Sequence, residues 1–228
     1  SAPSTGTLAF TGASNVTGGN GLSFNDADGT YNLGAVALSG GSRLAFLGGS
    51  AGSFTFGDVD ITGLLANTTA VNLTGATGNV TFATLDITGA STIGTRGIDM
   101  TGSTTASNVI ISGSSQIAGV GIGVDLTNAA ITGNFRYGDG SNTDANGAAS
   151  NITAVTPLVI TGLNGGIGNY NFADVNLNGD TTNLSVSAYF VLEGATGSGT
   201  RSDPGSLAGA EAANATYIVL LNNPTGGS

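Results

Sequence analysis

The chain has 228 residues, of which 40 are glycine, and it contains no cysteine, tryptophan or histidine. Its formal net charge is −10 at pH 7, and only 8% of its residues are charged. The four cations cannot form the basic face that neutralises nucleic-acid phosphates, and the acidic balance disfavours an anionic membrane surface. Without cysteine, a disulfide scaffold and thiolate metal sites are excluded as well.

Short alternating stretches of apolar and polar residues recur along the whole chain, which is typical of half-buried β-strands. Helix-forming residues are missing over long spans, and no apolar run approaches the roughly 18 residues of a transmembrane helix. In chain order, we expect strands at Leu22–Phe24, Tyr31–Leu33, Val36–Leu38, Leu44–Phe46, Phe54–Phe56, Val59–Ile61, Val71–Leu73, Val80–Phe82, Leu85–Ile87, Ile98–Met100, Val109–Ile111, Val124–Leu126, Phe135–Tyr137, Leu158–Ile160, Tyr170–Phe172, Val175–Leu177, Leu184–Val186, Tyr189–Val191 and Tyr217–Leu221.

One sequence motif occurs several times in the chain. The sequence GSFTFGDVDITG at Gly52–Gly63 returns as GNVTFATLDITG at Gly78–Gly89, starting 26 residues later. A third copy, GNYNFADVNLNG, occupies Gly168–Gly179, and a looser one occupies Gly29–Gly40. Repeats with a period of 20–50 residues indicate a solenoid, in which each unit buries its apolar face only by stacking on its neighbour.

Three short strands per repeat describe one turn of a three-sided parallel β-helix. We therefore predict an all-β fold, a right-handed three-sided parallel β-helix with roughly eight or nine coils and a length on the order of 40 Å. The Thr-Gly, Ser-Gly and Asn-Gly pairs are expected to supply positive φ angles at tight corners. A β-sandwich would also give short alternating strands, but it does not explain the closely matching repeats.

Two segments depart from the repeat. The polar segment Asp139–Ser150 is expected to be a loop projecting from one corner. Glu193–Ala215 breaks the period, and Ser206–Ala213 within it is the best candidate for a short helix. We therefore divide the chain into β-helix repeats at 1–192 and a capping or junction segment at 193–228.

The repeated G-x-Φ-x-F-x-x-Φ-D-I-T-G unit, where Φ is an apolar residue, resembles the β-strand repeats of large bacterial surface proteins. These include autotransporter passengers and filamentous-haemagglutinin-like adhesins. The tail from Tyr189 to Asn223 is similar to the opening of pectin-lyase-like β-helix domains, in which a glycine-rich turn, a short helix and an apolar strand begin a new helix. The resemblance implies a surface or secreted location and transfers no catalytic residue. It also suggests one unit of a tandem array, or a subunit that stacks end to end.

Stacked aspartates are the candidate metal ligands of the sequence. Asp60 and Asp86 hold equivalent outward positions on adjacent coils, with Asp58 beside them at the corner. Asn72, Asp99 and Asp125 are expected to form a similar ladder on another side. Such carboxylates suit Ca²⁺, a hard cation that takes several oxygen ligands. The alternative is a solvated polar face with modest mutual repulsion, and since no calcium-binding nonapeptide is present we assign no metal site.

The segment Asn25–Gly29 also resembles a calcium loop. The rest of an EF-hand pattern is missing, so we interpret the segment as an Asx turn.

The same residues bear on two other functions, glycoside hydrolysis and ice binding. Paired carboxylates could serve a glycosidase, but without histidine or lysine and with few aromatics we assign no catalytic or cofactor-binding residue. Outward threonines such as Thr55 and Thr81 suggest ice binding, but Asn32 and Asn171 interrupt the array. We therefore expect a non-enzymatic rod of an extracellular surface protein, a stalk or a filament subunit that stacks end to end. The alternative is an adhesin segment that binds a host or glycan surface.

Overall fold

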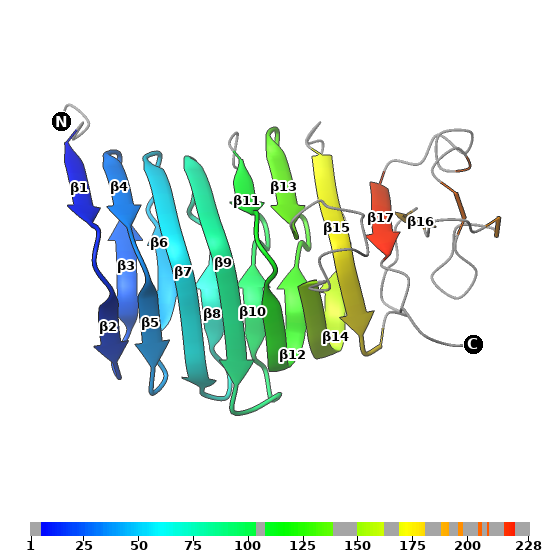
Figure 1. Cartoon of the computed structure of the whole chain (residues 1–228), viewed down its shortest axis with the longest axis horizontal. Helices are drawn as coiled ribbons and strands as arrows, with labels where there is room; N and C mark the ends of the chain where they lie inside the picture. Colours follow the sequence, from blue (N-terminus) through cyan, green and yellow to red (C-terminus); the bar gives the residue numbers. More distant parts are fainter. Residues whose placement is uncertain are drawn as a thin grey trace.

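The computed structural model describes residues 6–103, 108–138, 150–161, 169–180, 188–191, 196–197, 205–206, 209 and 217–221. Within these residues the chain is a β-solenoid in which every strand pair is parallel and almost no helix occurs. Figure 1 shows the strands standing side by side along the long axis, from β1 to β15 in the order of the sequence. The predicted all-β parallel solenoid is confirmed.

Each coil lays one strand, or half of a longer bent strand, on each of three sides of the solenoid. Six coils contribute to all three sides among the described residues. The first side is built from β1 (Thr7–Phe10), β4 (Thr30–Leu33), the first half of β7 (Ser53–Leu64), the first half of β9 (Asn79–Gly89), β11 (Val109–Ile111), β13 (Asn134–Tyr137), the first half of β15 (Asn169–Asn178), β17 (Tyr217–Leu221) and β16 (Ala188–Val191). The second side carries β2 (Ser14–Thr17), β5 (Val36–Ser39), the later halves of β7, β9 and β15, and the first halves of β12 (Gln116–Asp125) and β14 (Ser150–Val159). The third side carries β3 (Gly21–Asn25), β6 (Arg43–Leu47), β8 (Thr69–Asn72), β10 (Arg96–Asp99) and the later halves of β12 and β14.

The repeat in the sequence also determines which residues pair between neighbouring coils. From Ser53 to Thr62, β7 pairs with β9 in the alignment that the motif predicts, with Phe56 beside Phe82 and Asp60 beside Asp86; after Thr62 the register shifts, and Leu64 pairs with Gly89. One detail differs from expectation: β7 and β9 run unbroken through the corner between the first and second sides. The corner stays in the strand because the backbone there keeps its hydrogen bonds to the neighbouring coil.

Several strands escaped prediction for a common reason. β1 and β2, together with the starts of β12 and β14, have short or weak apolar patterns. In β12 and β14 the inward column that holds Val59 and Leu85 in earlier coils continues with Ser115 and Ser150. Both serines are buried, and they accept hydrogen bonds from the backbone N–H groups of Leu85 and Ser115 respectively. A hydroxyl that is bonded to backbone replaces an aliphatic side chain there.

The last strands do not follow the order of the sequence. β17 pairs with both β15 and β16, so the final strand lies between two strands that precede it. The predicted strand at Leu184–Val186 lies outside the described residues, as do almost all of the predicted loop at Asp139–Ser150 and most of the predicted helix at Ser206–Ala213. The predicted boundary between the β-helix repeats and the junction segment, at residues 192 and 193, also lies outside the described residues.

Aromatic and aliphatic columns fill the space between the three sides. Along the first side, Phe56 stacks on Phe82 with ring centroids 5.1 Å apart, and Tyr31 stacks on Phe54 at 4.9 Å. Phe24, which belongs to the third side, stacks on Phe46 at 5.3 Å. Such pairs contribute about 0.5–1.5 kcal/mol beyond their area burial. The core therefore consists of columns of stacked side chains that run along the axis of the solenoid. Each side chain packs against the coils before and after it.

Glycines at the corners serve two different purposes. The motif's closing Gly63 has a φ of 70°, as the sequence predicts for a tight corner. The opening Gly78 has no left-handed conformation; a Cβ there would lie 1.8 Å from the carbonyl oxygen of Gly52 on the preceding coil. Gly52 in turn approaches the carbonyl oxygen of Gly29, where a Cβ would lie at 2.3 Å. The prediction of positive φ is therefore wrong for these opening glycines and also for the closing Gly89, where a Cβ would lie 2.3 Å from the carbonyl oxygen of Gly119. These glycines allow close backbone contact between coils.

Replacing one aromatic side chain of a stacked core column should destabilise the solenoid. We expect Phe56→Ala to lower the free energy of unfolding by about 3–5 kcal/mol, because it leaves a cavity between Phe82 and the neighbouring columns. Thr55→Ala changes an exposed side chain of the same strand and should alter stability by less than about 0.5 kcal/mol. Urea unfolding followed by circular dichroism measures both. Equal losses would contradict the assignment of Phe56 to the core.

Candidate functional site

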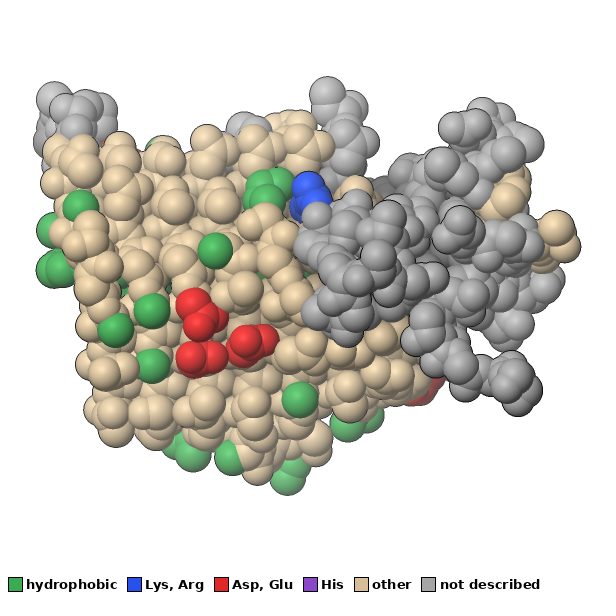
Figure 2. All heavy atoms as spheres, viewed as in Figure 1, with side chains coloured by type: hydrophobic (Ala, Val, Ile, Leu, Met, Phe, Trp, Pro, Cys, Tyr) green, Lys and Arg blue, Asp and Glu red, His purple; other side chains and the backbone are tan. Residues whose placement is uncertain are grey.

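Three carboxylates gather on the second side of the rod. Asp58 and Asp60 of β7 and Asp86 of β9 each place one oxygen within 4.8 Å of the other two. Asp58 and Asp60 are exposed and Asp86 is half-buried. Figure 2 shows acidic side chains gathered on a face that is otherwise mostly uncharged. The predicted stacking of Asp60 on Asp86, with Asp58 beside them, is confirmed.

The alternation of each strand explains this cluster. Val59 and Ile61 point into the core, so Asp58 and Asp60 must point outward, and the parallel register places Asp86 directly over Asp60. Burial raises the pKa of Asp86, and the negative charges of Asp60 and Asp58 raise it further. The backbone N–H of Gln116 donates a 2.8 Å hydrogen bond to Asp86 Oδ1, which opposes the rise. The stacked carboxylates thus repel one another at neutral pH.

The cluster offers fewer ligands than Ca²⁺ usually takes. Three carboxylates supply part of the six to eight oxygen ligands that this ion prefers. Two of them are already engaged, since Asp58 accepts a hydrogen bond from the Thr84 hydroxyl and Asp86 accepts one from the backbone N–H of Gln116. The geometry is compatible with a weakly held hard cation or with a solvated acidic face. The calcium hypothesis stays a prediction.

The second predicted ladder has a different environment. Asn72, Asp99 and Asp125 do occupy one outward column of the third side. Asp125 is buried, and its Oδ2 accepts a 2.9 Å hydrogen bond from Arg96 Nε, which also lies 4.0 Å from Asp99 Oδ2. An arginine thus already supplies the positive charge next to these two carboxylates. Sequence reasoning missed this pairing because Arg96 lies 29 residues from Asp125.

Each member of this ladder also caps the turn that follows it. Asn72 Oδ1 accepts hydrogen bonds from the backbone N–H and the hydroxyl of Thr74. Asp125 Oδ1 accepts the same pair from Thr127, at 3.0 and 2.6 Å. Asp99 accepts one from the backbone N–H of Thr101. Such local bonds are Asx-turn chemistry, so this ladder has a structural role.

The Asn25–Gly29 segment forms a corner rather than a ligand loop. Asp26 has a φ of 52°, a left-handed conformation that aspartate tolerates in turns. Its backbone N–H donates to the Leu47 carbonyl, and Asp28 Oδ1 accepts from the backbone N–H of Ala51. These bonds connect the segment to the neighbouring coil, and the predicted Asx turn stays a prediction.

The outward column that carries Thr55 and Thr81 is chemically mixed. Ala9 and Asn32 precede the two threonines in this column, and Ile110, Arg136 and Asn171 follow them on the later coils. A regular threonine array, which ice binding requires, is not formed in this column.

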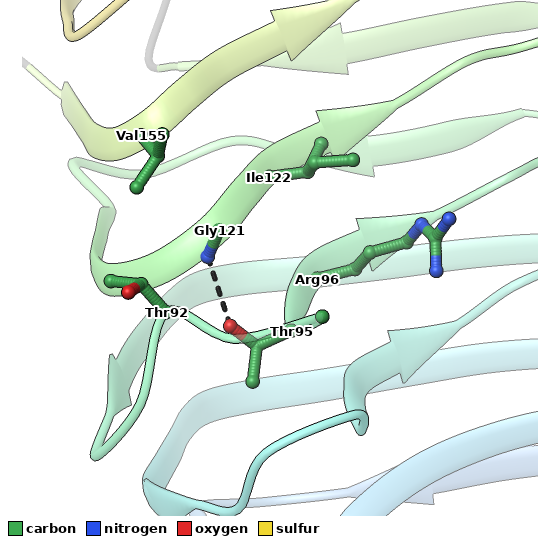
Figure 3. Close-up of a pocket in the computed structure, with 7 residues that line it drawn as sticks. Thr92, Thr95, Arg96, Gly121, Ile122 and Val155 are labelled. Atoms are coloured by element: carbon green, nitrogen blue, oxygen red, sulfur yellow. Dashed lines mark hydrogen bonds between the residues drawn. The ribbon is translucent and has the colours of Figure 1, made fainter.

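A hollow of about 270 Å³ lies at the corner between the second and third sides. Its lining consists of Thr92, Gly94, Thr95, Arg96, Gly121, Ile122 and Val155 (Figure 3). No carboxylate lines it, so this hollow lacks the acid pair that glycoside hydrolysis uses.

The N-terminal end of the solenoid exposes its core. Leu8 and Phe10 occupy the inward columns of β1, yet they are 45% and 50% exposed because no described coil covers them. Val16, Leu22 and Phe24 of the same coil are only partly buried. The outer edges of β1, β2 and β3 also carry no strand partner among the described residues.

Comparison with known proteins gives no relative: no family model, no curated protein and no solved structure matches the chain. Among the described residues, no helix is sufficiently long and apolar to cross a membrane.

The acidic cluster should make stability depend on pH. Because the pKa of Asp86 is raised in the folded state, its contribution to stability is fully present below its unfolded value near 3.8 and is lost as pH rises through the folded value. Asp60→Asn removes one repelling charge and should lower the pKa of Asp86 and raise stability at pH 7. Urea unfolding at pH 4 and pH 7 measures the difference. An Asp60→Asn variant less stable than the wild type at pH 7 would contradict the repulsion.

The Arg96–Asp125 pair should contribute to stability. Asp125→Ala removes the acceptor of Arg96 and of two groups of Thr127, and we expect a loss of roughly 1.5–3 kcal/mol. Asp99→Ala should lower the stability by less than Asp125→Ala does, because Asp99 lies farther from Arg96. Thermal unfolding of both variants, at low and high salt, checks the order.

Proposed function

We propose that this chain is a non-enzymatic rod of an extracellular bacterial surface protein, a stalk or filament subunit whose coils stack end to end. The observation that supports the proposal most directly is the open N-terminal end. Large apolar side chains of β1 are exposed at the end of the core column, where none of the described residues forms a covering coil. Burying them on another coil would contribute about 25 cal/mol per Å² of apolar area removed from water.

The edge strands of this end also lack protection against pairing. Natural sheet edges are usually blocked by charged residues, proline or bulges. The stretch 6–25, which spans β1, β2 and β3, contains no charged residue and no proline. A parallel strand could therefore add to each of the three sides without placing a charge against the apolar core.

The partner of such an end is another coil of the same kind. Strands in the solenoid are parallel, so the N-terminal edge of one rod is complementary to the C-terminal edge of another. A contact of this type is heterologous and does not close, which generates filaments. The resemblance of the repeat to those of autotransporter passengers and related adhesins supports the surface location.

A single substitution tests the stacking. We expect Phe10→Asp to abolish end-to-end association, since it places a charge in the inward column that the next coil must cover. Ala9→Asp adds the same charge to the outward face of the same strand and should leave association largely intact. Negative-stain electron microscopy and sedimentation velocity over a concentration series measure both.

Each outcome separates the candidate functions. Thin fibres of wild-type protein that are lost only in Phe10→Asp would support the filament subunit. Wild-type rods that stay isolated at every concentration would contradict stacking and favour the adhesive alternative. Release of reducing ends from polysaccharides would contradict the non-enzymatic role.

A further inference from the structure

The corner between the second and third sides changes its profile along the rod, and we call it the stepped corner. In two successive coils a loop interrupts the strands there, at residues 65–68 between β7 and β8 and at 90–95 between β9 and β10. In the next two coils, β12 and β14 pass through the same corner as continuous strands. Equivalent core positions are farther apart in the sequence in the two interrupted coils, at 61/71 and 87/98, than in the coils before (38/44) and after (117/124). The corner therefore projects at these two coils, which we call the projecting half, and recedes on either side of them; the two coils that follow are called the receding half.

Exposed apolar side chains concentrate at the stepped corner. The described residues contain six large hydrophobic side chains that are exposed, and three of them lie here: Leu65 (58%), Ile93 (69%) and Val155 (57%). Leu65 and Ile93 belong to the projecting loops, and Val155 belongs to the receding half. Two of the other three, Leu8 and Phe10, are at the open end.

The receding half contains the hollow of about 270 Å³. In Figure 3 the loop with Thr92 and Thr95 lies on one side of Gly121 and the strand with Val155 lies on the other. A Cβ at Gly121 would lie 2.4 Å from the Thr92 carbonyl oxygen, so no side chain can fill this position without a backbone shift. The solenoid thus places an apolar projection and a hollow next to each other.

Hydrogen bonds hold the projecting loops in place. The backbone N–H of Asn67 donates to the Ile93 carbonyl at 2.8 Å, which joins the two loops. The Thr95 hydroxyl donates to the Ser91 carbonyl at 2.7 Å and accepts from the backbone N–H of Gly121 at 2.9 Å. A surface already ordered in this way loses little conformational entropy on binding.

Arg96, which lines the hollow, is the one charged residue among the described lining of the stepped corner in a strongly acidic chain. The stretches that pass through this corner, 61–68, 87–95, 117–124 and 150–159, contain no charged residue. Arg96 itself is bonded to Asp125. Two copies with a net charge of −10 can therefore approach here without bringing acidic groups together.

We propose that the stepped corner joins two copies of this chain side by side, with their axes in opposite directions. A two-fold axis at the junction of the projecting and receding halves places the projecting half of each copy against the receding half of the other. Ile93 then enters the partner's hollow and contacts Val155 there, and the reverse contact forms by symmetry, as in any isologous interface. This lateral contact goes beyond the end-to-end stacking and does not depend on it. Together, the two contacts would assemble rods into bundles.

Sedimentation equilibrium of a variant with a blocked end tests the lateral contact. In the Phe10→Asp background we expect a concentration-dependent dimer. Adding Ile93→Asp should weaken that dimer about tenfold or more, the loss typical of removing a large apolar side chain from a buried contact. Leu47→Asp places the same charge on an exposed apolar residue of another corner and should have no such effect. A Phe10→Asp protein that is monomeric at all concentrations would overturn the proposal while leaving end-to-end stacking intact, and so would equal weakening by both substitutions.

Disulfide trapping tests the antiparallel arrangement. The wild-type chain has no cysteine, so an Ile93→Cys/Val155→Cys variant carries only the engineered thiols. The two positions of one chain are two coils apart, on the order of 10 Å, which exceeds the roughly 7 Å that a disulfide can span. Mild oxidation should therefore give a covalent dimer. Thr55→Cys, exposed on the first side, should stay monomeric under the same conditions. The antiparallel arrangement would be overturned if the double variant formed no covalent dimer, or formed no more covalent dimer than Thr55→Cys forms.

Discussion

The in-register stacking of one coil on the next is the constraint on which the rest of this structure depends. Each inward side chain lies against the equivalent side chain of the neighbouring coil, as Phe56 lies on Phe82. The same register satisfies the backbone hydrogen bonds of all three sides. A shift by one residue would turn each strand's apolar set outward, so the core and the backbone ladder specify the same alignment.

Everything on the outside follows from that alignment, favourable or not. Asp60 and Asp86 are stacked because their neighbours Ile61 and Ile87 are core residues, and the result is repulsion that raises the pKa of Asp86. On the third side the same rule stacks Asp99 on Asp125, but Arg96 is close to both. The register therefore decides which charges are neighbours, and the residue types decide whether the contact stabilises the fold.

Because each coil contacts only its neighbours, a solenoid does not bury its own ends. Among the described residues no coil covers β1, and its exposed apolar side chains motivate the stacking proposed for this rod. The corners allow more variation than the sides, since loops can be inserted there without disturbing the register. The stepped corner is such a place, and it is the surface that we propose joins two copies.

The sequence by itself determined the parallel solenoid, the register of β7 on β9 and the stacking of Asp60 on Asp86, because a repeat with period-two alternation leaves one consistent alignment. Tertiary structure alone decided three other features. Buried serines such as Ser115 replace aliphatic residues in a core column, since backbone groups of adjacent coils satisfy their hydroxyls. Arg96 meets Asp125 across a coil, and β17 inserts between β15 and β16. These features depend on contacts between residues far apart in the chain, where local alternation carries no information about the partner.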